Sequence, residues 1–313
     1  MAKPVLLMLG SYPPQDMEEL EKHFHILKFW EEKNQAAFLA AHAGDIRAIA
    51  TRGDLGAKRE LINQLPKLEV ISCFGVGVDG IDLAACRERG IKVTNTPDVL
   101  TEDVADLALA LMLSIARQIP QADAYTRAGA WAKSSFPLLT RMNGKRLGIL
   151  GLGRIGLAIA KRAEGFSMTI SYHTRLPRPE CAYTYYPTAV ELARKSDFLV
   201  AIVPGGAATD KLVDSKVLAA LGSKGFLINV ARGSVVDEEA LLTALEDKSI
   251  AGAALDVFWK EPNINPRFFK LENVVLHPHG GSGTVETRAA MGKLVRDNLS
   301  AHFAGKSLLT PVV

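Results

Sequence analysis

The sequence predicts an α/β protein of two lobes, each built on a parallel sheet that helices cover on both faces. Short apolar runs rich in β-branched residues alternate with polar, helix-forming stretches through the first third of the chain, and the alternation resumes after residue 145. Strict alternation of strand and helix is typical of a parallel sheet. A length of 313 residues is long for one domain and suits two.

In the first lobe five apolar runs predict strands. They are VLLML (5–9), HILKF (25–29), IRAIAT (46–51), LEVISCF (68–74) and IKVTNT (91–96). Polar stretches between them, such as DMEELEKH (16–23) and LAACRERG (83–90), favour helices.

The segment 101–119, TEDVADLALALMLSIARQI, predicts one long helix that closes at Pro120. Its apolar residues Val104, Leu107, Ala108, Leu111 and Ile115 fall on one face. A polar stretch, 121–144, follows and contains Trp131. The chain is expected to cross between lobes at about 98–120.

Six further runs predict the strands of the second lobe. They are RLGILGL (146–152), MTISYH (168–173), DFLVAIV (197–203), GFLINVA (225–231), GAALDVF (252–258) and NVVLHPH (273–279). The segment 284–303 predicts a final helix. It is too short to form a domain, so we expect it to pack on an earlier domain, with the chain returning at about residue 284.

The composition excludes several classes of function. With 37 Lys and Arg against 34 Asp and Glu, the net charge of +3 favours neither a nucleic acid nor a membrane surface as partner, although a small anion fits. No run of about 18 apolar residues could span a bilayer. The three cysteines lack metal-ligand spacing, so we expect no metal and no disulfide framework. These features predict a cytoplasmic protein.

The stretch GLGRIG, after one predicted strand and before a helix, indicates a dinucleotide site. Gly151 permits a tight turn, Gly153 lets the backbone approach a pyrophosphate, and Gly156 lets helix and strand pack closely. The amides of Arg154 and Ile155 then lie at a helix N-terminus, where anions bind favourably.

About 20 residues later, SYHTRLPR (171–178) lacks the acidic residue that usually binds the ribose of NAD. His173, Thr174 and Arg175 stand there instead, and Arg178 follows. A guanidinium matches a 2′-phosphate, and Thr and His can donate hydrogen bonds to it. The sequence therefore predicts NADP as cofactor, with NADPH preferred over NADH. The alternative is that Arg175 and Arg178 are solvated cations of a loop.

Three chemically compatible residues follow late strands of the second lobe. Arg232 lies in NVARGSVVDEEAL, Glu261 in DVFWKEP and His279 in HPHGGSGT. Ligands of open parallel sheets bind beyond the carboxyl ends of strands, so the three could converge. Arg232 could bind a carboxylate, His279 could exchange a proton near neutral pH, and Glu261 would favour the imidazolium.

Together with GLGRIGLAIAKR and FGVGVDGID, these stretches make nearly the whole chain resemble the D-isomer-specific 2-hydroxyacid dehydrogenase family. The likeness is strongest to its glyoxylate/hydroxypyruvate reductase branch. The resemblance implies a flavodoxin-like substrate domain, 1–97 with 284–313, and an NAD(P)-binding Rossmann domain, 98–283. The two-lobe pattern itself predicts a cleft between the lobes, and the long helix with the segment 121–144 suggests a homodimer.

The resemblance also assigns roles to residues. Arg232 would orient the 2-oxoacid, His279 would protonate its carbonyl, and Glu261 would sustain the protonated ring. The amides of Val76 and Gly77 would bind the substrate carboxylate, and Trp131 would contact substrate or pack a dimer. The implied cofactor-binding residues, besides those of the glycine turn and 173–175, are Thr101, Val203, Pro204, Thr209, Val230, Ala231, Asp256 and Gly281.

The expected reaction is NADPH-dependent reduction of glyoxylate to glycolate or of hydroxypyruvate to D-glycerate. A first alternative is a reductase of a bulkier 2-oxoacid, such as an aryl- or branched-chain pyruvate, because Phe74, Val76 and Val78 leave substrate size open. A second is a non-catalytic NAD(P)-sensing protein, since relatives of that kind would keep the fold.

Overall fold

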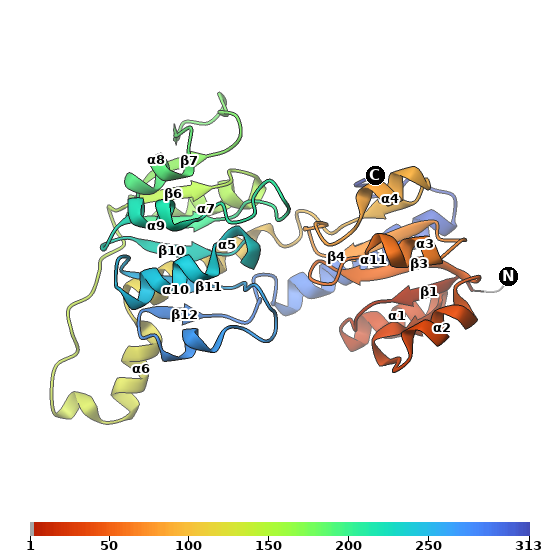
Figure 1. Ribbon diagram of the computed structural model, residues 1–313, viewed down its shortest axis with the longest axis horizontal. Coiled ribbons are helices and arrows are strands. Elements are labelled where there is room, and N and C mark those ends of the chain that lie inside the picture. The colour runs from red at the N-terminus through yellow and green to blue at the C-terminus, as the bar shows by residue number, and fades with distance from the viewer. Residues whose placement is uncertain (1–2) are drawn as a thin grey trace. The chain divides into compact units, whose positions relative to one another are not determined.

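The computed structural model describes residues 3–313, which fall into two compact units (Figure 1). Unit 1 contains the chain up to Leu100 together with Thr284–Val313, and unit 2 contains Thr101–Gly283. The first boundary thus lies three residues beyond the one that the sequence predicts, after residue 97. The final helix belongs to the unit formed by the first third of the chain.

Unit 1 is a five-stranded sheet, all parallel, in the order β2-β1-β3-β4-β5. This is the flavodoxin-like order. Its strands are β1 (Val5–Met8), β2 (His25–Lys28), β3 (Ile46–Arg52), β4 (Val70–Phe74) and β5 (Lys92–Thr94), and its helices are α1 (Pro14–His23), α2 (Gln35–His42), α3 (Arg59–Gln64), α4 (Leu83–Glu88) and α11 (Val285–Phe303).

Helices cover both faces of this sheet. Side chains from α2, α3 and α4 share a buried cluster with Leu7, Ile49 and Ile71 of the strands. Helix α11 packs on β4 and on α1, where Arg296 pairs with the buried Asp16. The two ends of the chain therefore build one core.

Unit 2 is a seven-stranded parallel sheet in the order β12-β11-β10-β9-β6-β7-β8. Its strands are β6 (Arg146–Leu150), β7 (Thr169–His173), β8 (Thr184–Tyr185), β9 (Phe198–Ala201), β10 (Phe226–Asn229), β11 (Gly252–Leu255) and β12 (Val274–Leu276), and its helices are α5 (Thr101–Ala116), α6 (Ile119–Arg127), α7 (Arg154–Glu164), α8 (Ala189–Arg194), α9 (Ser215–Leu221) and α10 (Glu238–Glu246).

Strand order in unit 2 reverses between β6 and β9, as in a doubly wound Rossmann sheet. Helices α8, α9 and α10 bury one face, and α5 and α7 pack against the other. The predicted fold class, two α/β lobes with parallel sheets, is confirmed. The reversal point is where such sheets bind ligands, outside the carboxyl ends of the strands.

The predicted helix over 101–119 is wrong at its end. Helix α5 stops at Ala116, Gln118 takes a left-handed conformation, and a new helix, α6, begins at Ile119. Pro120 lies in the first turn of α6, where its missing N–H is not needed. The proline therefore lies at the start of a second helix, which continues to Arg127 in the polar stretch 121–144.

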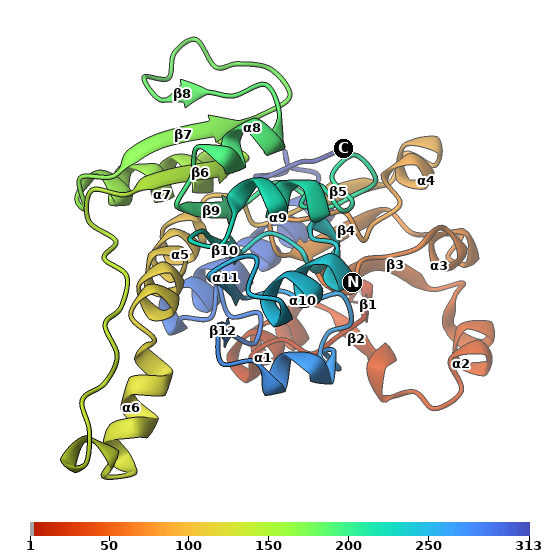
Figure 2. The ribbon, with the colours of Figure 1, turned by 60° about the vertical axis from the view of Figure 1, so that its left-hand side comes forward.

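The segment that includes α6 and a short 3₁₀ turn, η2 (Ala130–Ala132), projects away from the sheet of unit 2 in both views (Figures 1 and 2). We call residues 119–141 the arm. Trp131 is 70% exposed on it, and Leu138 is fully exposed. Within the described part of the chain, no helix combines the length and apolarity needed to cross a membrane.

Candidate active site

The glycine turn joins β6 to α7 at the reversal point of the sheet. Gly151 has a positive φ of 99°, and a Cβ there would lie 2.8 Å from the carbonyl oxygen of Ile202 beyond β9. A Cβ on Gly156 would lie 2.2 Å from the carbonyl oxygen of Gly151. Both glycines are therefore required by the packing of the chain on itself.

Gly153 is different, because the packing of the described chain does not require glycine there. Its φ of −80° suits any residue, and a Cβ built on it meets nothing within 4 Å among the described residues. No feature of the protein's own backbone requires glycine there. The open space beside Gly153, next to the amides of Arg154 and Ile155 that begin α7, suits a pyrophosphate.

The loop after β7 contains two arginines in different environments. Arg178 donates to Glu180 at 2.7 Å and to the carbonyl oxygen of Leu152 in the glycine turn. Arg175 is exposed and has no hydrogen-bond or ion-pair partner among residues 3–313. The structure thus separates a bonded Arg178 from an Arg175 whose guanidinium is available.

Thr174 and His173 are also partly engaged in this loop. The hydroxyl of Thr174 donates to the carbonyl oxygen of Leu176 at 2.6 Å, so in this conformation it can accept but not donate another hydrogen bond. His173 Nδ1 is 2.9 Å from the carbonyl oxygen of Tyr186, which leaves Nε2 for a ligand.

The other predicted cofactor residues lie at the carboxyl edge of the same sheet or on α5. Thr209 donates to the carbonyl oxygen of Pro204 at 2.6 Å and so closes the loop that begins at Val203 after β9. Val230 and Ala231 follow β10 and are buried. Thr101 is the first residue of α5.

His279 and Glu261 are in direct contact. Nδ1 of His279 lies 2.5 Å from Oε2 of Glu261, and the second carboxylate oxygen accepts the backbone N–H of Phe258 at 2.8 Å. The His279 side chain is 37% exposed, so its other nitrogen is accessible to a substrate. Because the carboxylate can only accept, the ring directs Nδ1–H to Glu261 and leaves Nε2 for chemistry.

Asp256 holds the backbone that places His279. Its buried carboxylate accepts from His277 Nδ1 at 2.6 Å and from the amides of Gly280 at 2.7 Å and Gly281 at 3.0 Å. His279 has a left-handed φ of 48°, and its N–H donates to the Asp256 carbonyl oxygen. Strained backbone of this kind persists where surrounding bonds impose it.

Arg232 lies at the same edge of the sheet as these residues. Strand β10, which precedes it, is hydrogen-bonded to β11, and β11 to β12, so the residues following all three strands emerge side by side. The backbone around Arg232 is fixed by Asn229, whose side chain donates to the Arg232 carbonyl oxygen and accepts from Ala231.

In unit 1, Val76 and Gly77 form a loop after β4. The carbonyl oxygens of Gly75 and Val76 accept hydrogen bonds from Thr96 and Asn95. The N–H groups of Val76 and Gly77 have no acceptor within residues 3–313. Two adjacent amides with their hydrogen-bonding capacity unused, on a loop whose carbonyls are held, suit an anion such as a carboxylate.

Residues 109–281 match the family model described as D-isomer specific 2-hydroxyacid dehydrogenase, NAD binding domain. The chain is 55% identical over 295 residues to glyoxylate/hydroxypyruvate reductase A of Arabidopsis thaliana, covering 94% of each chain. It belongs to the D-isomer-specific 2-hydroxyacid dehydrogenase family.

Two other members of this dehydrogenase family are close in sequence. A hydroxyphenylpyruvate reductase of Plectranthus scutellarioides is 53% identical over 296 residues, 95% of each chain. The crystal structure of an NADPH-dependent glyoxylate/hydroxypyruvate reductase of Sinorhizobium meliloti, in complex with NADP and malonate, has a TM-score of 0.92 and 46% identity, and the match covers 100% of this chain and 97% of that one.

These comparisons confirm the predicted family and its glyoxylate/hydroxypyruvate reductase branch. As a D-2-hydroxyacid dehydrogenase, the protein is an oxidoreductase that uses NAD or NADP. The relatives are named as reductases, which removes support from the alternative of a non-catalytic sensor.

Proposed function

We propose that the protein catalyses NADPH-dependent reduction of small 2-oxoacids, glyoxylate to glycolate and hydroxypyruvate to D-glycerate. The observation that carries the proposal is the 2.5 Å contact between His279 Nδ1 and Glu261 Oε2. Glu261 follows β11, and Arg232 follows the neighbouring strand β10. The names of the relatives in Arabidopsis and Sinorhizobium support the substrate class.

In this proposal His279 is the general acid. Its Nε2–H donates a proton to the carbonyl oxygen of the 2-oxoacid, while Glu261 stabilises the imidazolium that must be present before transfer. Arg232 binds the anionic substrate and polarises its carbonyl, and the amides of Val76 and Gly77 bind its carboxylate. Bound NADPH supplies the hydride, so that one hydride and one proton convert the keto group to an alcohol.

The preference for NADPH over NADH is the finer part of the proposal. Its support is that the end of β7 offers no carboxylate for the ribose, while Arg175 lies exposed without a partner in the described chain. Arg175 would pair with the 2′-phosphate, the Thr174 hydroxyl would donate to it, and the His173 ring would lie beside it. A 2′-phosphate would require the Thr174 hydroxyl to turn away from Leu176.

The other cofactor contacts are carried over as part of the same proposal. The glycine turn would bind the pyrophosphate, and Val203, Pro204 and Thr209 would lie along the adenosine. Thr101, Val230, Ala231 and Gly281 would line the path of the nucleotide. For Asp256 we propose support of the nicotinamide site through the Gly280 and Gly281 amides that it already holds.

We also propose a homodimer located in the cytoplasm. The exposed Trp131 and Leu138 of the arm support self-association, with Trp131 either packing in the dimer or reaching a substrate. Within the described residues, none of the three cysteines forms a disulfide, which suits a reducing compartment.

A single-turnover assay of NADPH oxidation with hydroxypyruvate tests the catalytic roles. His279→Gln and Arg232→Ala should each lower the rate by about 100-fold or more, because they remove the acid and the substrate cation. The exposed controls His23→Gln and Arg194→Ala should leave the rate unchanged. Rates near wild type in both site variants would refute the assignment.

A second candidate is reduction of a bulkier 2-oxoacid. It is favoured by the 53% identity to a hydroxyphenylpyruvate reductase. Comparing kcat/KM for glyoxylate, hydroxypyruvate and hydroxyphenylpyruvate decides between the two, and a higher value for the aromatic substrate would select the second.

A further inference from the structure

Glu261 and Arg232 both lie outside regular helices and strands, so contacts between loops must fix them. Glu261 ends the segment 256–261 after β11, and Arg232 directly precedes the 3₁₀ turn η3 (Gly233–Val235) after β10. The turn after Arg232 has two 3₁₀ hydrogen bonds of its own, whereas residues 257–261 make no backbone–backbone hydrogen bond within the described chain. The precision that catalysis requires must therefore come from the packing between them.

The first contact joins the two backbones. A Cβ on Gly233 would lie 2.0 Å from the carbonyl carbon of Phe258 and 2.4 Å from the nitrogen of Trp259. Only glycine allows this approach. The turn that follows Arg232 thus lies directly against the segment that leads to Glu261.

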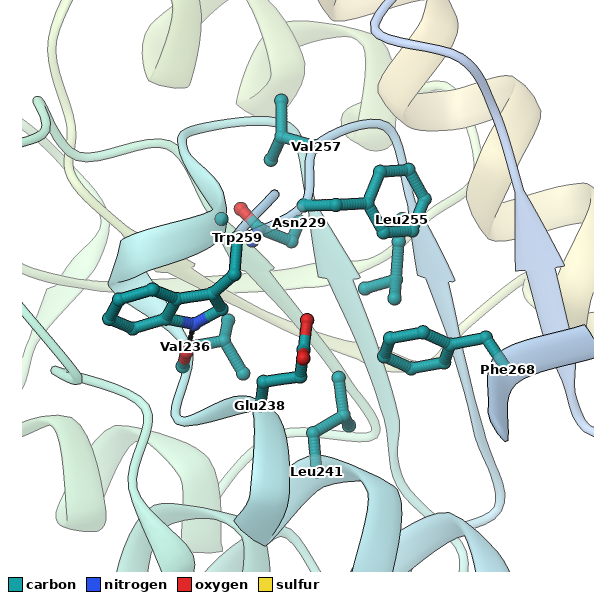
Figure 3. Close-up of a pocket in the computed structure, with 10 residues that line it drawn as sticks. Asn229, Val236, Glu238, Leu241, Leu255, Val257, Trp259 and Phe268 are labelled. Atoms are coloured by element: carbon teal, nitrogen blue, oxygen red, sulfur yellow. Dashed lines mark hydrogen bonds between the residues drawn. The ribbon is translucent and has the colours of Figure 1, made fainter. Parts of the chain in front are cut away.

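The second contact is made by the Trp259 side chain. Its indole Nε1–H donates to the carbonyl oxygen of Val236 at 2.7 Å, and Lys211 lies 5.9 Å from the ring centroid. Figure 3 shows the indole beside Val236, at the rim of a cavity of about 10 Å³ that Glu238 and Leu241 also line. Trp259 therefore spans from the Glu261 segment to the far side of the Arg232 turn.

The third contact links Trp259 to His279 through Phe258 and Glu261. The N–H of Phe258, adjacent to Trp259, donates to one oxygen of Glu261, and the other oxygen contacts His279. The Glu261 carboxylate is thus oriented by the backbone that Trp259 anchors. Because the indole N–H itself is bonded to Val236, Trp259 can act on the His279 ring only through this backbone and Glu261.

We propose that Trp259 is a positioning residue, whose indole N–H holds the segment 256–261 so that Glu261 stays aligned with the His279 ring. The inference rests on the proposed function, because it assigns the alignment to the general acid of that reaction. The charged and titratable groups near His279 in unit 2 are Glu261 on the ring, Asp256 with His277 behind the loop, and Arg232 beyond the adjacent strand.

Trp259→Phe tests the proposal because it keeps an aromatic ring and removes the N–H donor, together with part of the indole volume. The first measurement is the ¹⁵N spectrum of the histidine rings in the protein without ligands, with His279 assigned from His279→Gln. In the wild type the neutral ring should hold its proton on Nδ1, toward Glu261. We expect W259F to raise the share of the other tautomer at least about threefold.

The second measurement is the pH profile of hydroxypyruvate reduction. In W259F we expect kcat to fall about three- to tenfold at high pH and less at low pH, because a loosened Glu261 supports the charged ring less. KM for NADPH should stay within about twofold. Trp30→Phe, in unit 1, is the matched control and should change neither readout.

An unchanged tautomer and pH profile in W259F would overturn the proposal, and the proposed function would stand if H279Q were still inactive. If the wild type reduced no 2-oxoacid, the proposed function would fail, and the tautomer measurement would still decide the role of Trp259. If W259F melts below the assay temperature, both measurements are repeated for wild type and variant at a temperature below its melting point.

Discussion

Gly153 and Gly156 differ in what surrounds the place where a side chain would begin. A Cβ on Gly156 would lie 2.2 Å from the carbonyl oxygen of Gly151, whereas a Cβ on Gly153 would meet no atom of the described chain within 4 Å. The fold therefore requires glycine at 156, whereas the described chain does not require it at 153, where we propose that the pyrophosphate binds.

Alanine substitutions should separate these two roles. Gly156→Ala should lower the free energy of unfolding by about 1–3 kcal/mol, because the turn must move to admit the methyl group. Gly153→Ala should cost less than about 1 kcal/mol, and yet weaken NADPH binding about tenfold or more. Denaturant unfolding and fluorescence titration measure the two effects. NADPH binding of wild-type strength in G153A would contradict the proposed pyrophosphate site.

Arg175 and Arg178 give a second contrast between neighbouring residues. Arg175→Ala should weaken NADPH binding about 10- to 100-fold and leave NADH unchanged, because only NADPH presents a 2′-phosphate to the guanidinium. Arg178→Ala should weaken both cofactors, since Arg178 ties the loop to Leu152 of the glycine turn. Binding titrations of each variant with both cofactors test this. Equal losses for both cofactors in R175A would refute recognition of the 2′-phosphate.

At the scale of elements, the strands were the most predictable part of the fold. Most of them are apolar runs, as expected of strands buried on both faces, and the structure places all except β8 within the predicted range or one residue beyond it. β8 (Thr184–Tyr185) was missed because two residues form no recognisable run. The end of α5 was misplaced because Pro120 can end one helix or begin the next.

The site was predictable to the extent that residue type reveals chemistry. The sequence identifies three residues that follow predicted strands and whose side chains can take part in acid–base or anion-binding chemistry: Arg232, Glu261 and His279. The bonded state of Arg178, the hydrogen bond from Thr174 to Leu176 and the anchoring by Trp259 depend on tertiary contacts. No local pattern in the sequence predicts these contacts. The one available signal was glycine at position 233, directly after Arg232, because glycine permits another backbone to approach closely.

An ion pair at the opposite edge of the unit 2 sheet provides a prediction about pH. Asp197, before β9, accepts two hydrogen bonds from the Arg146 side chain and one from its backbone N–H at the start of β6. The Arg146 guanidinium lowers the pKa of Asp197 below its ordinary value, although partial burial acts in the opposite direction. The folded state therefore favours the ionised carboxylate.

Asp197→Asn should lower the free energy of unfolding at pH 7 by about 1 kcal/mol, a modest figure because Arg146 is half exposed. A depressed pKa contributes stability above the pKa of the unfolded state, about 3.9, and this contribution is lost as pH falls through the folded value. The gap between wild type and D197N should therefore narrow below about pH 4. Urea unfolding at pH 7, 5 and 3.5 measures it, and a constant gap would contradict the assignment.

At the scale of the whole molecule, the arm leaves a tryptophan and a leucine in solvent, which is costly for a lone chain. Light scattering after size exclusion should give twice the mass of the chain. Trp131→Asp with Leu138→Asp should shift the protein toward the monomer, whereas Leu176→Asp, an exposed leucine outside the arm, should not. A monomeric wild type at micromolar concentration would refute the proposed dimer.

The return of α11 to the core formed by residues 5–100 also bears on how the protein is made. While a ribosome is still synthesising the chain, the first five strands have emerged but lack the helix that packs on β4 and α1. Unit 2 is contiguous in sequence, so all the residues of its core are available once Gly283 has left the ribosome. The nascent second unit can therefore fold before the first is complete, and part of one face of the N-terminal sheet stays uncovered until the last thirty residues are made.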